Sequence, residues 1–148
     1  MSTTALTTEA VSGSEVATLA APTSLATPTS MIRRGLVAAG LVAIAAIHLA
    51  DLPRKMSEVP YLGWAYIGLI VASLVLAELV VTRSDRRLMA ASGALAAAVF
   101  VGFVINRTVG MPQAMDDIGN WTEALGMISL LVEGTVVWAA ARAWFARD

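Results

Sequence analysis

Four long apolar blocks, separated by short polar segments, dominate the pattern of the chain. The blocks cover residues 35–52, 61–82, 88–106 and 121–141, and each is close to the ~20 residues with which a helix crosses ~30 Å of hydrocarbon. We expect Pro53 to end the first helix, because proline disrupts a helix interior. Helices satisfy their own backbone hydrogen bonds in lipid. The pattern therefore predicts an all-α membrane protein, a bundle of four transmembrane helices.

The segment that precedes the first block has a different composition. Residues 1–30 are rich in Ser, Thr and Ala, and their only charged residues are Glu9 and Glu15. A segment without aromatic residues or a long apolar run buries too little surface to offset the entropy of ordering. A secretory signal has a basic segment before its apolar stretch, and no basic residue precedes Arg33. We therefore expect a disordered cytoplasmic tail over 1–30 and a transmembrane domain over 31–148.

The basic residues of the polar segments favour one orientation in the membrane. With four spans, both termini and the middle loop share one side, which carries seven basic residues: Arg33, Arg34, Arg83, Arg86, Arg87, Arg142 and Arg147. The opposite side carries Arg54, Lys55 and Arg107. Because Lys and Arg are enriched in cytoplasmic segments, we expect a multi-pass protein of the plasma membrane with both termini in the cytoplasm.

Composition and charge exclude several classes of function. Of the 148 residues, 57% are hydrophobic and 14% are charged, and the net charge is -1. These values exclude a soluble enzyme and a nucleic-acid binder with a basic surface. The chain has no cysteine and one histidine, which excludes thiolate sites and a bis-histidine haem. No GxSxG, HExxH or phosphate-binding glycine loop is present, so we expect no enzyme activity and assign no catalytic, cofactor or metal residues.

Two ionisable residues lie at the end of the first block. His48 and Asp51 are three residues apart, so they share one helix face. An imidazole beside a carboxylate can hydrogen-bond to it, take up a proton or bind a metal. The structural alternative is that His48 packs between helices with one hydrogen bond while Asp51 reaches the interface.

Two glutamates lie within the apolar blocks. Glu78 lies one turn before the end of the second block, and it either takes part in a proton path or pairs with a nearby arginine. Glu133 lies near the middle of the fourth block, where a carboxylate must be paired, hydrated or protonated. We expect Glu133 to face the bundle interior, either as a proton-handling group or as a protonated side chain that bonds a neighbouring helix. The residues expected on its helix face are small or polar: Thr122, Gly126 and Ser129.

The polar segment 106–121 joins the third and fourth blocks and contains glycines and a proline that favour a structured turn. Arg107 is expected to face an acidic residue on the same side of the membrane: Asp51, Asp116 or Asp117. We expect His48, Asp51 and Arg107 to form one outer cluster.

Three methionines lie on the same side as this cluster: Met56, Met111 and Met115. Thioether sulfurs suit Cu(I), and His48 is a further candidate ligand. Ordinary apolar contact of the loop with the bundle is the favoured interpretation of the three methionines.

Small residues recur at four-residue spacing in the first two blocks: Gly35, Ala39, Ala43, Gly68 and Ala72. Such residues let helix backbones approach closely in lipid. We interpret them as contacts within the bundle. The alternative is a dimer face of the GxxxG type.

Three segments carry a family resemblance: IHLADLP (47–53), YLGWAYIG (61–68) and NRTVGMPQAMDDIGNWTEALGMISLLVEG (106–134). In these segments the chain resembles a family of small, uncharacterised four-helix integral membrane proteins from actinobacteria. The bias toward Ala, Gly and Arg, with a single Lys, is typical of such genomes. The resemblance covers about residues 35–141 and implies a four-helix membrane protein. The family has no assigned activity, so the resemblance implies no cofactor and no site residue.

Two classes of function follow from the pattern. The favoured one is a non-catalytic protein of the lipid bilayer, an accessory or interaction subunit that associates with a second copy of itself or with another membrane protein. The alternative is a small proton-coupled or ion-conducting transporter with Glu133, Glu78 and His48 as relay points. A weaker third interpretation is an outer-face metal binder that uses His48, Asp51 and Met111. No nucleic-acid partner is expected.

Overall fold

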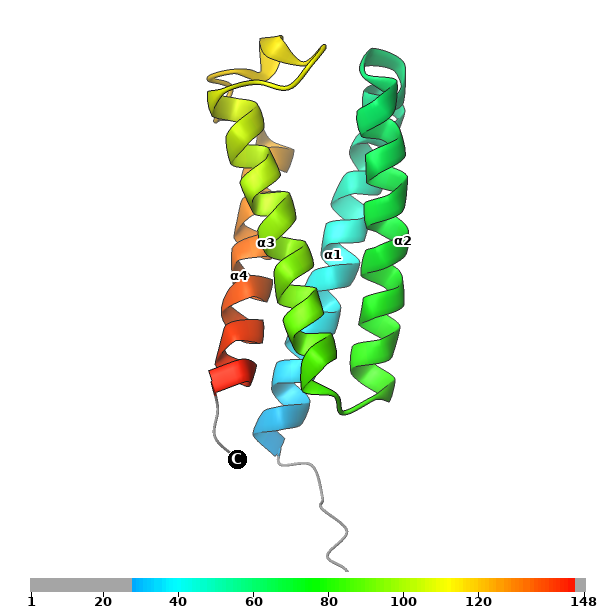
Figure 1. The fold of residues 1–148 in the computed structure, drawn as a ribbon, viewed down its shortest axis with the longest axis vertical. Helices are drawn as coiled ribbons and strands as arrows, with labels where there is room; N and C mark the ends of the chain where they lie inside the picture. The colour runs from blue at the N-terminus through cyan, green and yellow to red at the C-terminus, as the bar shows by residue number, and fades with distance from the viewer. Residues whose placement is uncertain (1–27, 146–148) are drawn as a thin grey trace, which may run out of the picture.

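The chain forms an up-and-down bundle of four long helices (Figure 1). This computed structural model describes residues 28–145. The helices are α1 (Pro28–Glu58), α2 (Pro60–Thr82), α3 (Arg86–Thr108) and α4 (Ala124–Phe145), and a short 3-10 helix, η2 (Met115–Asp117), lies between α3 and α4. Each long helix is long and apolar enough to cross a membrane. The predicted fold class, a four-transmembrane-helix bundle, is confirmed.

The predicted tail over 1–30 falls largely outside the described residues. Residues 1–27 are not described, whereas residues 28–30 already belong to α1. The first transmembrane helix therefore begins earlier in the chain than residue 35.

The prediction that Pro53 ends the first helix is wrong, because α1 continues through it to Glu58. A proline removes one backbone hydrogen bond and crowds the preceding turn. The turn that follows Pro53 is held by long-range contacts of its own side chains. Arg54 binds Glu123, and Lys55 binds Asp117. These ion pairs oppose the local cost of proline, which the hydropathy pattern does not reveal.

The fourth helix begins at Ala124 rather than at Trp121. Thr122 therefore precedes the helix and is exposed, so it does not share the face of Glu133 as predicted. The side chain of Glu123 binds two arginines from other helices. The backbone carbonyl of Glu123 accepts the first hydrogen bond of the helix, from Met127 N–H at 3.0 Å.

The tightly packed core lies in one half of the bundle, near the start of α1, the end of α4 and the α2–α3 turn. We call it the terminal half, and we call the opposite half, beside the α1–α2 turn and the α3–α4 loop, the loop half. The two helix pairs converge in the terminal half and stand further apart in the loop half (Figure 1). The buried core residues come from all four helices: Val37, Ala38, Leu41, Ile44, Ala77, Val80, Met89, Ala96, Val136 and Ala139.

Two glycines allow close helix contacts in the terminal half. A Cβ atom on Gly40 would lie 2.3 Å from Val136 Cγ2, and a Cβ atom on Gly93 would lie 2.8 Å from Ala140 Cβ. A larger residue at either position would therefore force a shift of α4 or of its side chains.

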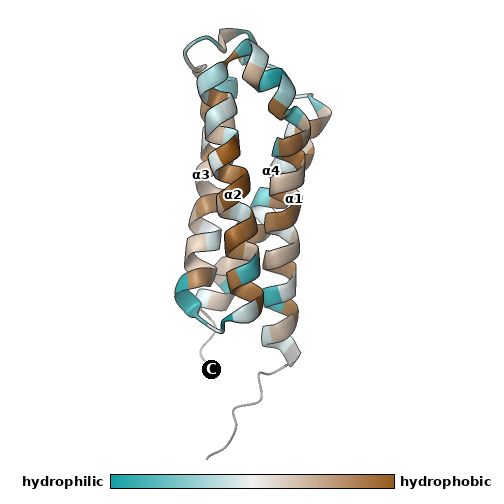
Figure 2. Cartoon of the chain, turned by 90° about the vertical axis from the view of Figure 1, so that its right-hand side faces the viewer, coloured by the Kyte–Doolittle hydropathy of each residue, from teal (hydrophilic) through white to brown (hydrophobic). Residues whose placement is uncertain are grey.

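The predicted small-residue contacts of the first helix are wrong for Gly35 and Ala39. Both are exposed, and a Cβ on Gly35 would meet nothing within 4 Å. The buried face of α1 carries Val37, Leu41 and Ile44 instead, which lie on the other side of the helix. The exposed residues of α1 include the large apolar Ile32, Val42 and Leu49, as expected where lipid replaces water. Apolar residues also predominate along the middle of the helices (Figure 2).

Arginines of one helix cap the carboxyl end of another in the terminal half. Arg34 of α1 donates to the carbonyls of Val80 and Val81 at 2.9 and 2.6 Å. Arg86 of α3 donates to the carbonyl of Trp144. The last carbonyls of a helix lack partners within the helix and carry partial negative charge, so these guanidinium groups stabilise the ends of α2 and α4.

Candidate functional site

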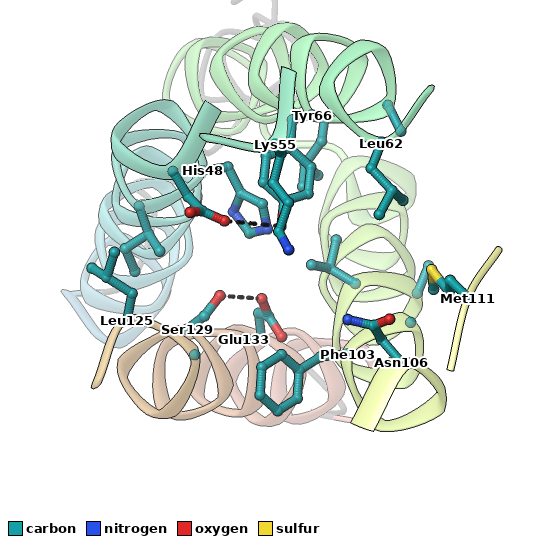
Figure 3. Close-up of a pocket in the computed structure, with 18 of the residues that line it drawn as sticks. His48, Lys55, Leu62, Tyr66, Phe103, Asn106, Met111, Leu125, Ser129 and Glu133 are labelled. Atoms are coloured by element: carbon teal, nitrogen blue, oxygen red, sulfur yellow. Dashed lines mark hydrogen bonds between the residues drawn. The ribbon is translucent and has the colours of Figure 1, made fainter. Parts of the chain in front are cut away.

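A cavity of about 440 Å³ lies in the loop half, between the four helices (Figure 3). Its wall includes residues of α1, α2, α3 and α4, together with residues of the α3–α4 loop. Most of the lining is apolar, and the polar groups gather at two levels. One is a carboxylate from the middle of α4, and the other is an ion network at the loop end. This combination of an apolar wall with a few placed polar groups is typical of ligand sites.

Glu133, near the middle of α4, is the carboxylic side chain of the cavity that lies away from the ion network. Glu133 is 1% exposed, which agrees with the expectation that this side chain faces the bundle interior. Ser129, one turn earlier on α4, donates its hydroxyl to Glu133 Oε1 at 2.5 Å. Among the described residues, Glu133 Oε2 has no hydrogen-bond partner. A buried carboxylate oxygen without a partner is costly, so this atom is where the cavity can bind a donor.

His48 lies on the opposite wall, on α1, and is 7% exposed. Its Nδ1 atom lies 2.9 Å from the carbonyl oxygen of Ile44. A carbonyl only accepts, so we assign the proton to Nδ1, which leaves Nε2 of the neutral ring as an acceptor. The ring meets Tyr66 edge to face, with centroids 4.7 Å apart.

The structure connects His48 to Asp51 through Tyr66 rather than directly. The Tyr66 hydroxyl donates to Asp51 Oδ2 at 3.4 Å while its ring contacts His48. Asp51 itself pairs with Arg54, one turn later on α1, at 2.9 Å. Of the three residues expected in one outer cluster, Asp51 and Arg107 are therefore connected by ion pairs through Arg54 and Glu123. His48 makes no ion pair with either and contacts Tyr66 instead.

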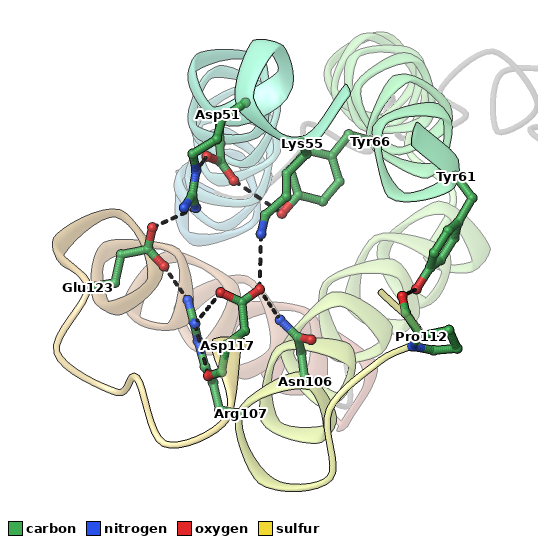
Figure 4. A network of polar contacts seen from close by, with 10 residues as sticks. Asp51, Lys55, Tyr61, Tyr66, Asn106, Arg107, Pro112, Asp117 and Glu123 are labelled. Carbon is green, nitrogen blue, oxygen red and sulfur yellow. Dashed lines mark hydrogen bonds and ion pairs between the residues drawn. The ribbon is translucent and has the colours of Figure 1, made fainter. Parts of the chain in front are cut away.

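An ion network closes the loop end of the cavity (Figure 4). In it, three cations alternate with three anions in the order Asp51, Arg54, Glu123, Arg107, Asp117 and Lys55. We call these six residues the loop-end ion network. Its contacts join α1, α3 and the α3–α4 loop. Because the charges balance, each cation is neutralised within the network.

Arg107 is the central cation of this network and is 4% exposed. Its Nη1 atom lies 3.0 Å from Asp117 Oδ1, and its Nη2 atom pairs with Glu123. Of the acidic partners predicted for Arg107, the structure selects Asp117. Asp116 is exposed, and Asp51 is bound by Arg54 instead.

Asp117 is the loop residue that binds the most donors. It accepts from Arg107, from Lys55 at 3.0 Å and from Asn106 at 2.9 Å. Burial alone would raise the pKa of Asp117. The hydrogen bonds from Asn106 and Lys55 and the nearby positive charges lower that pKa below its usual value, so Asp117 is ionised at neutral pH.

Five residues of the site were not among the sequence candidates: Arg54, Lys55, Tyr66, Asn106 and Glu123. A local signal existed for one of them. Arg54 follows Asp51 at the three-residue spacing that pairs opposite charges on a helix. The spacing has this meaning only if the helix continues through Pro53, which the sequence did not predict. The pairing of Glu123 with both arginines depends on the fold of the loop and has no local signal.

Glu78 does not belong to this site. Its side chain is exposed on α2, does not line the cavity and makes no salt bridge with any described residue. The expected relay of Glu133, Glu78 and His48 is therefore divided: the structure brings Glu133 and His48 to one cavity and places Glu78 elsewhere.

The α3–α4 loop is a structured turn, as its glycines predicted. Gly110 and Gly119 have φ angles of 85° and 77°, which L side chains rarely adopt. Tyr61 of α2 donates its hydroxyl to the carbonyl of Pro112 at 2.7 Å and so fastens the loop to α2.

The methionines of this end do not gather around His48. Met56 packs against Gly63, and Met115 packs against Gly110. Met111 lines the cavity near α3 (Figure 3). Between residues 28 and 145, no group of three His, Asp or Glu side chains is placed to hold a metal ion.

No protein-family model, curated protein or solved structure matches this chain. The resemblance to four-helix membrane proteins of actinobacteria stays a prediction. Evidence on function therefore comes from the geometry of the cavity and of its two polar levels.

Proposed function

We propose that this chain is a non-catalytic accessory protein of the plasma membrane that binds a small lipophilic molecule in its loop-half cavity. One observation carries the proposal. A cavity of about 440 Å³ lies within a membrane-spanning bundle, and the buried carboxylate of Glu133 has an unpartnered oxygen there. The volume falls in the ordinary range of small-molecule sites. A protein that holds such a molecule can store it or deliver it to a partner membrane protein.

The proposed orientation places both termini in the cytoplasm and the loop half toward the outside. The excess of arginines at the terminal end supports it. A reporter fused after Asp148 should be active only in the cytoplasm. A reporter inserted after Gln113, in the α3–α4 loop, should be active only outside. The reverse pair of results would overturn the orientation.

The binding proposal is tested by filling the cavity. Gly102 of α3 lines the cavity, and a Cβ at this position would meet nothing within 4 Å. Gly102→Leu should therefore occupy the cavity without a backbone clash. Gly134→Leu on α4 is the matched control, because it too has open space but does not line the cavity.

The measurement is binding of the neutral compound 1-adamantanol to the purified full chain, by calorimetry. We expect saturable binding in the wild type and in Gly134→Leu, and a loss of at least about tenfold in Gly102→Leu, because the leucine takes the space of the ligand. Equal binding to all three proteins would indicate partitioning into detergent and would contradict a cavity site for this compound.

A second candidate function is proton-coupled transport, which the presence of Glu133 and His48 in one cavity favours. Transport would require the packed core of the terminal half to open. In liposomes, Glu133→Gln should abolish proton flux, and Glu78→Gln should leave it unchanged because Glu78 lies outside the cavity. Flux that is absent in the wild type, or that survives Glu133→Gln, would exclude this candidate.

A further inference from the structure

Given the cavity proposed above as a binding site, we infer that its ligand is an amphiphilic amine, an apolar molecule whose single ammonium group binds Glu133. The inference deepens the proposed function by naming the chemical class of the ligand. It depends on the charge balance of the cavity, on the acceptors that surround Glu133 and on the apolar wall along α2 and α3.

The charge balance leaves Glu133 without a counter-ion. Three cations line the cavity: Arg54, Lys55 and Arg107. All three are bound by the carboxylates of the loop-end ion network. Within residues 28–145, no basic side chain forms a salt bridge with Glu133, and its one hydrogen bond comes from Ser129. A buried carboxylate is stabilised by an opposite charge in contact with it, which an ammonium ion supplies.

The groups around Glu133 are acceptors, which suit an ammonium ion. Glu133 Oε2 has no partner. Ser129 uses its one proton on Glu133 Oε1, so its oxygen has lone pairs left for an incoming donor. His48, on the facing wall, presents Nε2 as an acceptor because Nδ1 donates to Ile44. An ammonium group has three donors and no acceptor, so it complements this set better than a hydroxyl or a carboxylate.

The apolar part of the ligand would contact the remaining wall of the cavity, which α2 and α3 form. Small residues of α2 and α3 line this side: Ala65, Gly68, Ala72, Ala98 and Gly102. Cβ atoms on Gly68 and Gly102 would meet nothing within 4 Å, so space remains beside both helices. Helices α2 and α3 contact each other much less than α1 contacts α2 or α3 contacts α4. An apolar group therefore fits along these helices while the ammonium group lies against α4.

Paired probes separate the ammonium group from the apolar group. 1-Adamantanamine and 1-adamantanol share one cage and differ in a cationic or neutral polar group. In calorimetry on the purified full chain, the amine should bind the wild type at least about tenfold more tightly than the alcohol, because a charge-assisted hydrogen bond is stronger than a neutral one. Glu133→Gln, which keeps the shape of the side chain, should remove this preference and leave the alcohol within about threefold of its wild-type affinity.

Glu78→Gln is the matched control, since it removes an intramembrane carboxylate outside the cavity. It should preserve the preference for the amine. Melting temperatures and elution volumes report whether each variant is folded. If Glu133→Gln does not fold, the wild-type comparison of amine with alcohol, together with the loss of both in Gly102→Leu, decides the inference.

The outcomes distinguish this inference from the proposed function. If both compounds bind equally, and Gly102→Leu weakens both, the cavity is a binding site but its ligand is not an amine. If the amine binds tightly but Gly102→Leu does not weaken it, both proposals fail. If the amine is preferred equally in the wild type and in Glu133→Gln, the ammonium site lies elsewhere and the inference is overturned.

Discussion

Arg107 binds two carboxylates that lie six residues apart in the α3–α4 loop segment, Asp117 and Glu123. Replacing one partner of a buried ion pair leaves the other charge without compensation, which costs about 3–5 kcal/mol when the pair is fully buried. Here the two carboxylates keep part of their surface in solvent. Arg107→Leu should therefore lower the free energy of unfolding by about 2 kcal/mol, measured as a drop in thermal midpoint in detergent.

The control for Arg107→Leu is Arg83→Leu. Arg83 is exposed, and no salt bridge joins it to a described residue, so its loss should change the midpoint little. Equal effects of the two substitutions would show that the loop-end ion network does not stabilise the fold.

The lowered pKa of Asp117 predicts how stability responds to acid. Hydrogen bonds and cations stabilise its ionised form in the folded state, so its contribution is complete above the usual pKa of 3.8. The contribution is lost as the pH falls through the lower pKa of the folded state. The difference in stability between wild type and Asp117→Asn should therefore be constant near neutral pH and shrink below about pH 4. Thermal melts of both proteins over this pH range measure it.

The sequence predicted the buried carboxylic side chain of the site, Glu133, but not most of the ion pairs of the loop-end ion network. The position of Glu133 follows from depth alone, since a carboxylate at the centre of a span must avoid lipid. The partners of Lys55 and Glu123 depend on how the loop folds over the bundle and on the continuation of α1 beyond Pro53. Hydropathy is a local property and carries no information on these long-range pairs.

At the scale of the element, α1 offers a matched pair of glycines. Gly40 faces Val136 so closely that any Cβ would clash, whereas Gly35 faces open space. Gly40→Leu should destabilise the bundle by about 2 kcal/mol or more, as overpacking does. Gly35→Leu should be neutral or slightly stabilising because leucine favours the helix. Similar thermal midpoints for the two variants would contradict the close approach of α1 to α4.

The same helix shows which features of a membrane-spanning helix the sequence predicts and which it does not. The four spans were predictable because each is a continuous apolar run of the right length. The face of α1 that packs was not, since small residues at four-residue spacing mark the exposed Gly35 and Ala39 as readily as a contact face. Which side of an all-apolar helix faces protein is decided by the other helices.

At the scale of the whole molecule, the two halves of the bundle should differ in local stability. The terminal half contains the packed core, and the loop half contains the cavity. Backbone amides open more readily where fewer buried contacts hold them. Hydrogen exchange in detergent should therefore be faster in residues 62–70 of α2 than in residues 74–82 of the same helix. Uniform protection along α2 would show that the cavity is filled in solution or that the halves are equally packed.

The arginines at the ends of α2 and α4 connect folding to membrane insertion. Arg34 and Arg86 belong to the basic excess that sets the proposed orientation, and both are engaged by carbonyls of neighbouring helices. Charges that direct insertion act before the helices have assembled, and the same charges then join one helix to the next. In the opposite orientation these guanidinium groups and the carbonyls that they bind would together lie on the outer side, against the bias of basic residues toward the cytoplasm. The arginines that join the helices at this end are therefore the same ones that favour its cytoplasmic placement.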